Sequence, residues 1–132
     1  MLDIDVTVLE QTVNDAKSVL KDGLLATDIW DRETGLSLAG HNSQPEAVAL
    51  FNQLTNEISS TLAGSGFPAL NRYYMLDIED GNTIVVQRHG DDLMSGMLLD
   101  ANRVNLGILV SVVIPRITAG VEKARNTGET ED

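Results

Sequence analysis

Hydrophobic residues recur every three or four positions in three stretches of the chain, which is the spacing of a helix with one buried face. The first stretch covers residues 5–21, and the third covers residues 104–125. The second begins after Ser43 and ends before the glycine pair at Gly64 and Gly66. These three stretches are predicted to be helices that each bury one face.

Local signals mark the ends and the interior of these predicted helices. Gly23 can adopt a left-handed conformation, so we expect it to end the first helix. Ser43 and Glu46 have the spacing of a capping box, and Pro45 lies in the first turn, where no amide partner is needed. Pro115 lies inside the third pattern and should bend that helix, because it removes one backbone hydrogen bond.

Five shorter apolar runs lie between the helices and are predicted to be strands, at residues 24–30, 36–40, 70–78, 83–89 and 93–99. Short turns join the first two strands and also the last three, so these neighbours must pair antiparallel. The element order is helix, two strands, helix, three strands, helix. This order predicts an α+β fold, with one five-stranded antiparallel sheet and helices on both faces. The first and third helices are expected on one face and the second helix on the other.

Composition narrows the classes of function. The chain has 132 residues, 42% of them hydrophobic, which suits one domain with a substantial core. We assign that domain to residues 1–125 and expect the acidic segment 126–132 to be disordered. A net charge of −11 disfavours binding to nucleic acids or anionic membranes, because both need a cationic surface. There is no cysteine, no signal-peptide pattern and no run that could span a bilayer, so we expect a cytoplasmic protein.

No catalytic, metal-binding or cofactor-binding motif is recognisable. His41 and His89 are the two imidazoles, and a metal site would need them beside carboxylates such as Asp91 or Asp92. We interpret both histidines as surface residues at strand ends. A hydrolytic enzyme that uses His89 with Asp91 or Asp92 is a weak alternative, since adjacency in sequence is not catalytic geometry. We therefore expect a protein that is not an enzyme and has no catalytic residue, metal or cofactor.

Four local motifs in this element order resemble the Roadblock dynein-light-chain family. They are GLLA at 23–26, DRETGLSLA at 31–39, GDDL at 90–93 and NLGIL at 105–109. The resemblance extends over roughly residues 6–124, and the asparagine–leucine–glycine opening of the last helix is its most specific part. It implies a profilin-like fold and pairing into homodimers or heterodimers. Bacterial and archaeal members are regulators of, or platforms for, small Ras-like GTPases, including one that controls gliding polarity.

In that family, the strand after the second helix lies at the sheet edge and pairs with the same strand of a second copy. The corresponding strand here covers residues 70–78, and its side chains are apolar on both faces. Such an edge would promote aggregation if it stayed unpaired. We therefore expect a homodimer. Its interface is expected to include Arg72, Tyr73, Tyr74, Met75 and Leu76.

The resemblance implies a non-enzymatic regulator or scaffold that binds a small Ras-like GTPase and modulates its nucleotide cycle or localisation. The polar face of the second helix is the expected contact surface, through Gln53, Asn56, Glu57 and Ser60. The alternative is a small-ligand sensor, because profilin-like folds can hold a pocket between sheet and helices. The sequence leaves open whether hydrolysis or exchange is stimulated, whether the protein only acts as a scaffold, and whether the native dimer contains one or two kinds of chain.

Overall fold

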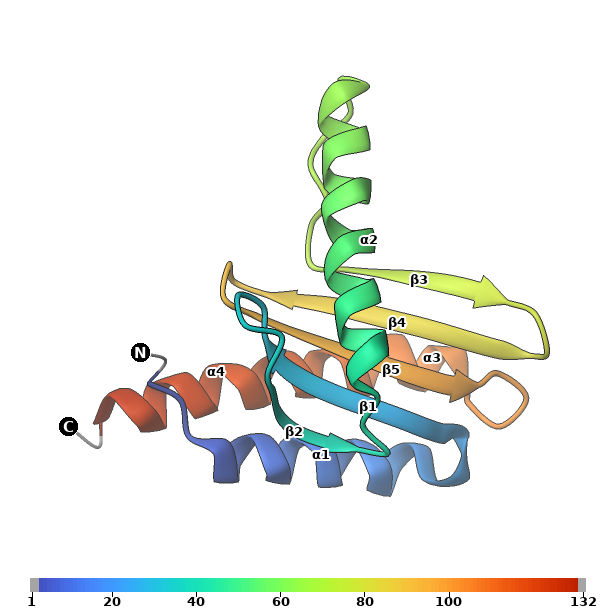
Figure 1. The fold of residues 1–132 in the computed structure, drawn as a ribbon. Coiled ribbons are helices and arrows are strands. Elements are labelled where there is room, and N and C mark those ends of the chain that lie inside the picture. The colour runs from blue at the N-terminus through green and yellow to red at the C-terminus, as the bar shows by residue number, and fades with distance from the viewer. Residues whose placement is uncertain (1–2, 131–132) are drawn as a thin grey trace.

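The computed structural model describes residues 3–130, which form a five-stranded antiparallel sheet with helices on both faces (Figure 1). The elements in chain order are α1 (Val6–Leu20), η1 (Lys21–Gly23), β1 (Leu24–Asp31), β2 (Ser37–His41), α2 (Pro45–Gly64), β3 (Tyr73–Ile78), β4 (Asn82–His89), β5 (Leu93–Asp100), α3 (Leu106–Ile108), η2 (Leu109–Val113) and α4 (Ile114–Thr130). The strand order is β2-β1-β5-β4-β3, so β3 is an edge strand. The predicted fold class and element order are confirmed.

The two faces of the sheet are covered differently. Helices α1 and α4 lie side by side along one face, as expected for the first and last helices (Figure 1). Helix α2 crosses the other face at a steep angle to the strands and then continues past β3, away from its own sheet (Figure 1). One face is therefore closed by two helices, while the other is covered only in part.

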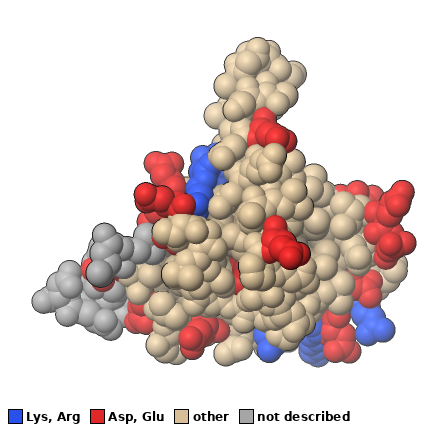
Figure 2. All heavy atoms as spheres, viewed as in Figure 1, with Lys and Arg blue, Asp and Glu red and all other residues tan. Residues whose placement is uncertain are grey.

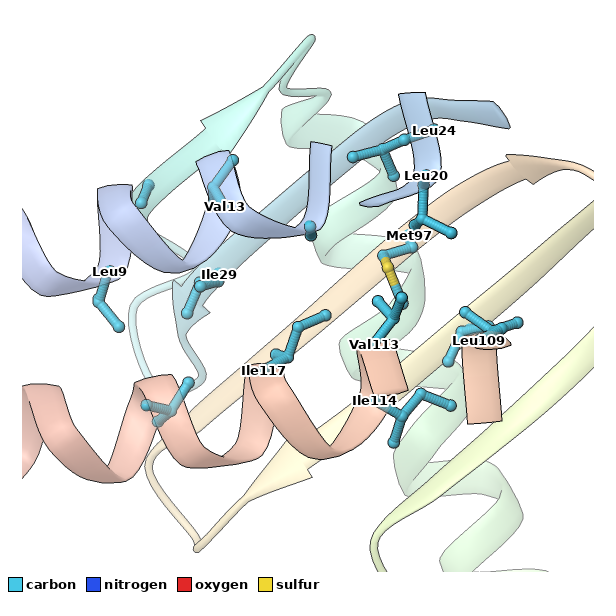
Figure 3. Close-up of a cluster of buried hydrophobic side chains, with 14 of the residues drawn as sticks. Leu9, Val13, Leu20, Leu24, Ile29, Met97, Leu109, Val113, Ile114 and Ile117 are labelled. Carbon is cyan, nitrogen blue, oxygen red and sulfur yellow. The ribbon is translucent and has the colours of Figure 1, made fainter. Parts of the chain in front are cut away.

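The main core fills the space between the sheet and the α1/α4 layer (Figure 3). It is built from aliphatic side chains and includes Leu9, Val13, Leu20, Leu24, Ile29, Met97, Leu109, Val113, Ile114 and Ile117. A smaller cluster lies beneath α2 and consists of Trp30, Val48, Val86 and Met94. The larger cluster shows that most of the apolar burial stabilising the subunit lies on the α1/α4 side.

Two predicted helix signals act differently in the structure. Lys21, with φ of 53°, ends α1 in place of Gly23. Gly23 is buried, and a Cβ there would lie 2.5 Å from Cγ2 of Val104, so this glycine serves close packing. Ser43 does not cap α2, because its hydroxyl donates to Oδ1 of Asp28 at 2.7 Å. Gln44 takes the N-cap position without a side-chain hydrogen bond.

The last helix changes its winding just before Pro115. Residues Leu109–Val113 form a π-helical turn, which lies where the missing proline amide would disturb regular α-helical bonding. Helix α4 then continues to Thr130, past the predicted end at residue 125, because no further proline interrupts it. The disorder of segment 126–132 stays a prediction, and residues 131–132 lie outside the described residues. No helix within residues 3–130 is long and apolar enough to cross a membrane.

Helices α1 and α4 are in close contact where Gly120 faces Thr12. The Thr12 hydroxyl is buried and donates to the carbonyl oxygen of Val8 at 2.8 Å. A Cβ at Gly120 would overlap the Thr12 side chain. The absence of a side chain at Gly120 therefore allows the two helices to pack closely at this point.

We predict that Gly120→Ala destabilises the protein by about 1–3 kcal/mol, because the added methyl group must push α1 and α4 apart. Urea unfolding followed by circular dichroism would measure the change. Gly64→Ala is the matched control, since no atom lies within 4 Å of a Cβ at that position. Equal free energies of unfolding for the Gly120 variant and the parent would contradict the prediction.

Candidate interaction surface

The edge strand β3 has one side without a partner strand in the described chain. It pairs antiparallel with β4, and the amide of Arg88 donates to the carbonyl oxygen of Arg72 at 2.8 Å. Backbone direction alternates along an antiparallel strand, so the peptide groups of Tyr73, Met75 and Asp77 point away from the sheet. These groups form an open row that another strand could pair with.

The side chains of β3 divide between the two faces as predicted. Tyr73 packs against the main core, and Tyr74 packs against the cluster beneath α2. The Tyr74 hydroxyl lies 2.9 Å from the Thr55 hydroxyl. Burial raises the pKa of Tyr74, and this hydrogen bond partly opposes the rise. Met75 and Ile78 stay 36% and 38% exposed, so they are the apolar side chains that the edge leaves for a partner.

Polar contacts hold the first half of α2 on the sheet. The indole Nε1 of Trp30 donates to Oδ1 of Asn52 at 2.9 Å, and the Asn52 amide donates to the carbonyl oxygen of Arg32 at 3.2 Å. The Arg32 guanidinium donates to Oδ1 of Asn56 at 2.6 Å. The Trp30 and Phe51 rings stack with centroids 6.4 Å apart. These contacts fix the direction in which the second half of α2 leaves the sheet.

The second half of α2 projects past β3 and is almost uncharged. From residue 55 to residue 71, Glu57 is the one charged residue, and Figure 2 shows the projecting part as largely free of acidic and basic side chains. The helix ends in a Schellman motif, in which Phe67 N–H donates to Leu62 O at 3.2 Å and Gly66, with φ of +77°, donates to Ala63 O at 3.4 Å. This motif holds Phe67 in place although its side chain is 66% exposed.

An apolar groove lies between the first half of α2 and the uncovered part of the sheet. It has a free volume of about 270 Å³, and its lining includes Ala26, Ile84 and Leu98 from the sheet. Leu50, on the helix side, is 57% exposed. Asp28 is the one ionisable side chain in the described lining. Its carboxylate accepts two serine hydroxyl hydrogen bonds, at 2.5 and 2.7 Å, and a backbone amide hydrogen bond at 3.3 Å.

The residues predicted to contact a GTPase all lie exposed on α2. Gln53 donates to Glu57 at 3.2 Å, one turn further along the helix. Asn56 is held by Arg32, and Ser60 lies on the projecting half. The structure thus brings these residues onto one helix surface, and their role in binding stays a prediction. Sequence analysis missed Phe67, although its position between Gly66 and Pro68 marks an aromatic residue outside a helix.

The prediction that His89 lies at the surface is wrong. Its side chain is 5% exposed, because α4 covers the end of β4, and its Nε2 lies 2.8 Å from the Ser95 hydroxyl. Asp92 accepts two hydrogen bonds of 2.7 Å from Arg125, which also donates to the His89 carbonyl oxygen. No cluster of three possible metal ligands occurs in the part of the chain that the structure describes.

Comparison with solved structures identifies the fold. MglB from Myxococcus xanthus aligns with a TM-score of 0.71 and 12% identity, over 95% of this chain and 90% of that protein. The gliding protein MglB from Thermus thermophilus aligns with a TM-score of 0.73 and 12% identity, over 92% and 90%. A Roadblock/LC7 domain from Streptomyces avermitilis aligns with a TM-score of 0.60 and 14% identity, over 89% and 95%. The chain has the Roadblock fold.

This likeness confirms the expected Roadblock architecture at the level of fold. Profilin from Schizosaccharomyces pombe also aligns, with a TM-score of 0.51 and 10% identity over 90% of this chain and 94% of that one, so the profilin-like prediction is confirmed as well. No protein-family model matches the sequence. No curated protein sequence matches it either.

We predict that His89 makes the protein less stable as the pH falls from 7 to 5. Burial and the nearby positive charge of Arg125 lower the pKa of His89 to about 4, from 6.5. As the pH falls, His89 is protonated in the unfolded chain at a higher pH than in the folded chain. The free energy of unfolding should therefore fall by about 1.4 kcal/mol per pH unit below pH 6.5. The hydrogen bonds from Arg125 lower the pKa of Asp92, so that carboxylate stays charged throughout this range.

Chemical denaturation at pH 7 and at pH 5 would measure this effect in the parent and in His89→Gln, which cannot titrate. The loss of stability should be about 2 kcal/mol larger in the parent, from the linkage slope over the roughly 1.5 units below pH 6.5. The same pH dependence in both proteins would show that His89 is not responsible.

Proposed function

We propose that the protein is a homodimer joined through β3, and that the dimer binds a small Ras-like GTPase to regulate its nucleotide cycle or localisation. The observation that carries this proposal is the open edge of β3, where Met75 and Ile78 are exposed beside a helix that runs past the edge. The Roadblock fold supports it, and one MglB structure has a tetrameric arrangement. We place this activity in the cytoplasm.

The alternation of the backbone along β3 restricts how two copies can pair. Only the outward residues Tyr73, Met75 and Asp77 can exchange backbone hydrogen bonds with the same strand of a second copy. A two-fold register centred on Met75 pairs Met75 with its counterpart and Tyr73 with the partner's Asp77. It also places Tyr74 opposite the partner's Leu76. A register centred on Asp77 would instead bring two carboxylates face to face, which is unfavourable.

A GTPase regulator of this kind needs no catalytic residue of its own. It can hold the switch loops of the GTPase in one conformation, and this changes the cost of reaching the geometry for hydrolysis or exchange. Gln53, Glu57 and Ser60 offer hydrogen-bonding groups on the exposed face of α2 for such a contact. Assignment of the partner class rests on the family resemblance, because fold alone does not determine function.

The apolar groove beside α2 supports a second candidate function, a small-ligand sensor. At about 270 Å³ it is close to the size of small-ligand sites. Its one ionisable group, Asp28, already accepts three hydrogen bonds within the subunit, which leaves few polar groups to select a ligand. A panel of metabolites in thermal-shift assays would reveal such a ligand, because binding to the folded state raises its stability.

We predict that Met75→Arg weakens dimerisation at least about tenfold, a cost of about 1.4 kcal/mol, because it places two positive charges opposite each other at the centre of the interface. Sedimentation would measure the association.

Crosslinking tests the same pairing: Met75→Cys should form a covalent dimer with a short bismaleimide, since the parent has no cysteine. Leu36→Cys, 62% exposed beside the opposite edge strand, is the matched control and should stay uncrosslinked. A monomeric parent at micromolar concentration would rule out the proposed dimer.

We predict that Ser60→Arg weakens binding to the GTPase while leaving the dimer intact, because the large side chain blocks the outer face of α2. Ser18→Arg introduces the same change on α1, on the other face of the sheet, and should have no effect. Binding and GTP turnover would be measured with a set of bacterial and archaeal Ras-like GTPases. If no GTPase binds the parent or changes its rate of turnover, the proposed function is wrong.

A further inference from the structure

We infer that Phe67 of each subunit inserts into the apolar groove of the second copy, between its α2 and its sheet. This insertion presupposes the proposed dimer and adds to it an anchor residue and an occupant for the groove. It also implies that the assembled protein has no vacant ligand pocket at this place. Four features of the chain support the inference: the layout of the uncovered sheet, the symmetry of the β3 pairing, the length of α2 and the distribution of charge.

The uncovered part of the sheet contains a continuous apolar row. Beneath its own α2, cross-strand neighbours form a first row, which consists of Tyr74, Val86, Gly96 and Asp28. Two residues further along the strands, a second row runs from β3 to β1 and consists of Leu76, Ile84, Leu98 and Ala26. The last three of these line the groove. Within the described subunit α2 borders this apolar row on one side, because Ala47 and Leu50 line the same groove, and the groove between them is open.

The symmetry of the proposed pairing places the partner's α2 over this second row. Helix α2 crosses β3 at Tyr74, because the Tyr74 and Thr55 hydroxyls lie 2.9 Å apart. In the register centred on Met75, the partner's Tyr74 lies opposite Leu76. The partner's α2 therefore crosses the shared edge beside Leu76, where the second row begins, and runs antiparallel to the first helix.

The length of the projecting segment matches the width of the sheet that it must cross. Helix α2 ends at Gly64, nine residues after Thr55, which at 1.5 Å per helical residue is roughly 14 Å. From the partner's β3 to β5 of the first subunit is about three strand spacings, roughly 14 Å. The end of the partner's α2, with Phe67 beside it, would thus lie over β5 near Leu98, which lines the groove. There Ala47, at the start of α2, forms the side of the groove.

The charge distribution favours a second copy over a different protein as the occupant. The chain carries a net charge of −11, yet residues 58–71 have no charged side chain. In the described lining of the groove, Asp28 is the only charged side chain. Interface centres are depleted in charge and are anchored by aromatic residues in pockets. A basic partner attracted by the acidic surface would find no available carboxylate in the groove. The uncharged tip and the uncharged groove are complementary to each other.

Crosslinking of two single-cysteine chains tests the insertion. A mixture of Phe67→Cys and Ala47→Cys chains should form a covalent heterodimer with a short bismaleimide, whereas a mixture of Phe67→Cys and Leu36→Cys should not. Met75→Cys reports the β3 pairing in parallel. If Met75→Cys crosslinks and the Phe67/Ala47 mixture does not, the insertion is wrong and the proposed dimer stands. If neither pair crosslinks, the dimer itself is wrong.

Affinity gives an independent measure. Phe67→Ala should raise the dissociation constant of the dimer at least tenfold, because it removes the side chain that fills the groove. Folding of the subunit should be unaffected, since Phe67 is 66% exposed. Leu36→Ala truncates a side chain that is 62% exposed but lies far from the groove, so its dimer should match the parent. Equal dissociation constants for Phe67→Ala and the parent would overturn the inference.

Discussion

The structure depends on an edge strand that its own subunit does not complete. Tyr73, Met75 and Asp77 direct their peptide groups away from β4, and no other strand in the described chain reaches them. Natural proteins usually protect such an edge, because an open row of amides and carbonyls templates pairing with other chains. Here the edge instead carries exposed apolar side chains and lies beneath a helix that extends beyond it. Both features are consistent with a surface that is completed by assembly.

The two faces of the sheet have correspondingly different roles. On the α1/α4 face, Gly120 allows two helices to pack closely over an aliphatic core, and this face supplies most of the burial. On the other face, α2 covers one row of side chains and leaves an open groove beside the next row, where Leu76, Ile84 and Leu98 are half-buried. Gly96 brings α2 close to the sheet, since a Cβ there would lie 3.3–3.4 Å from the Trp30 and Phe51 rings. A subunit stabilised mainly on one face can leave part of the other face for binding.

Periodicity predicted most of the fold, because helical and strand spacing are local properties of the sequence. The errors arose where a residue's partner is distant in sequence. Ser43 has the local signature of a helix cap, yet Asp28 of β1 takes its hydroxyl. Gly23 has the signature of a left-handed cap, yet its lack of a side chain accommodates Val104. His89 follows a strand and precedes a turn, and only the position of α4 shows that it is buried. The edge position of β3 came from the family resemblance, whereas the groove and Phe67 required the structure.

The arrangement of α2 allows one helix to serve two interfaces. An α-helix has about 3.6 residues per turn, so a residue two or five positions away from another lies roughly on the opposite side of the helix. Gln53 and Glu57 are two positions from Thr55, and Ser60 is five. These three residues therefore face away from the sheet that Thr55 contacts. A second α2 seated beside the first would occupy the flank of Ala47 and leave that outer face open. Assembly and GTPase binding would then use different faces of the same helix. Dimerisation would hold the two polar faces in a fixed position relative to each other, so a single GTPase could contact both. Loss of the dimer would then weaken GTPase binding, although no residue that touches the GTPase has changed.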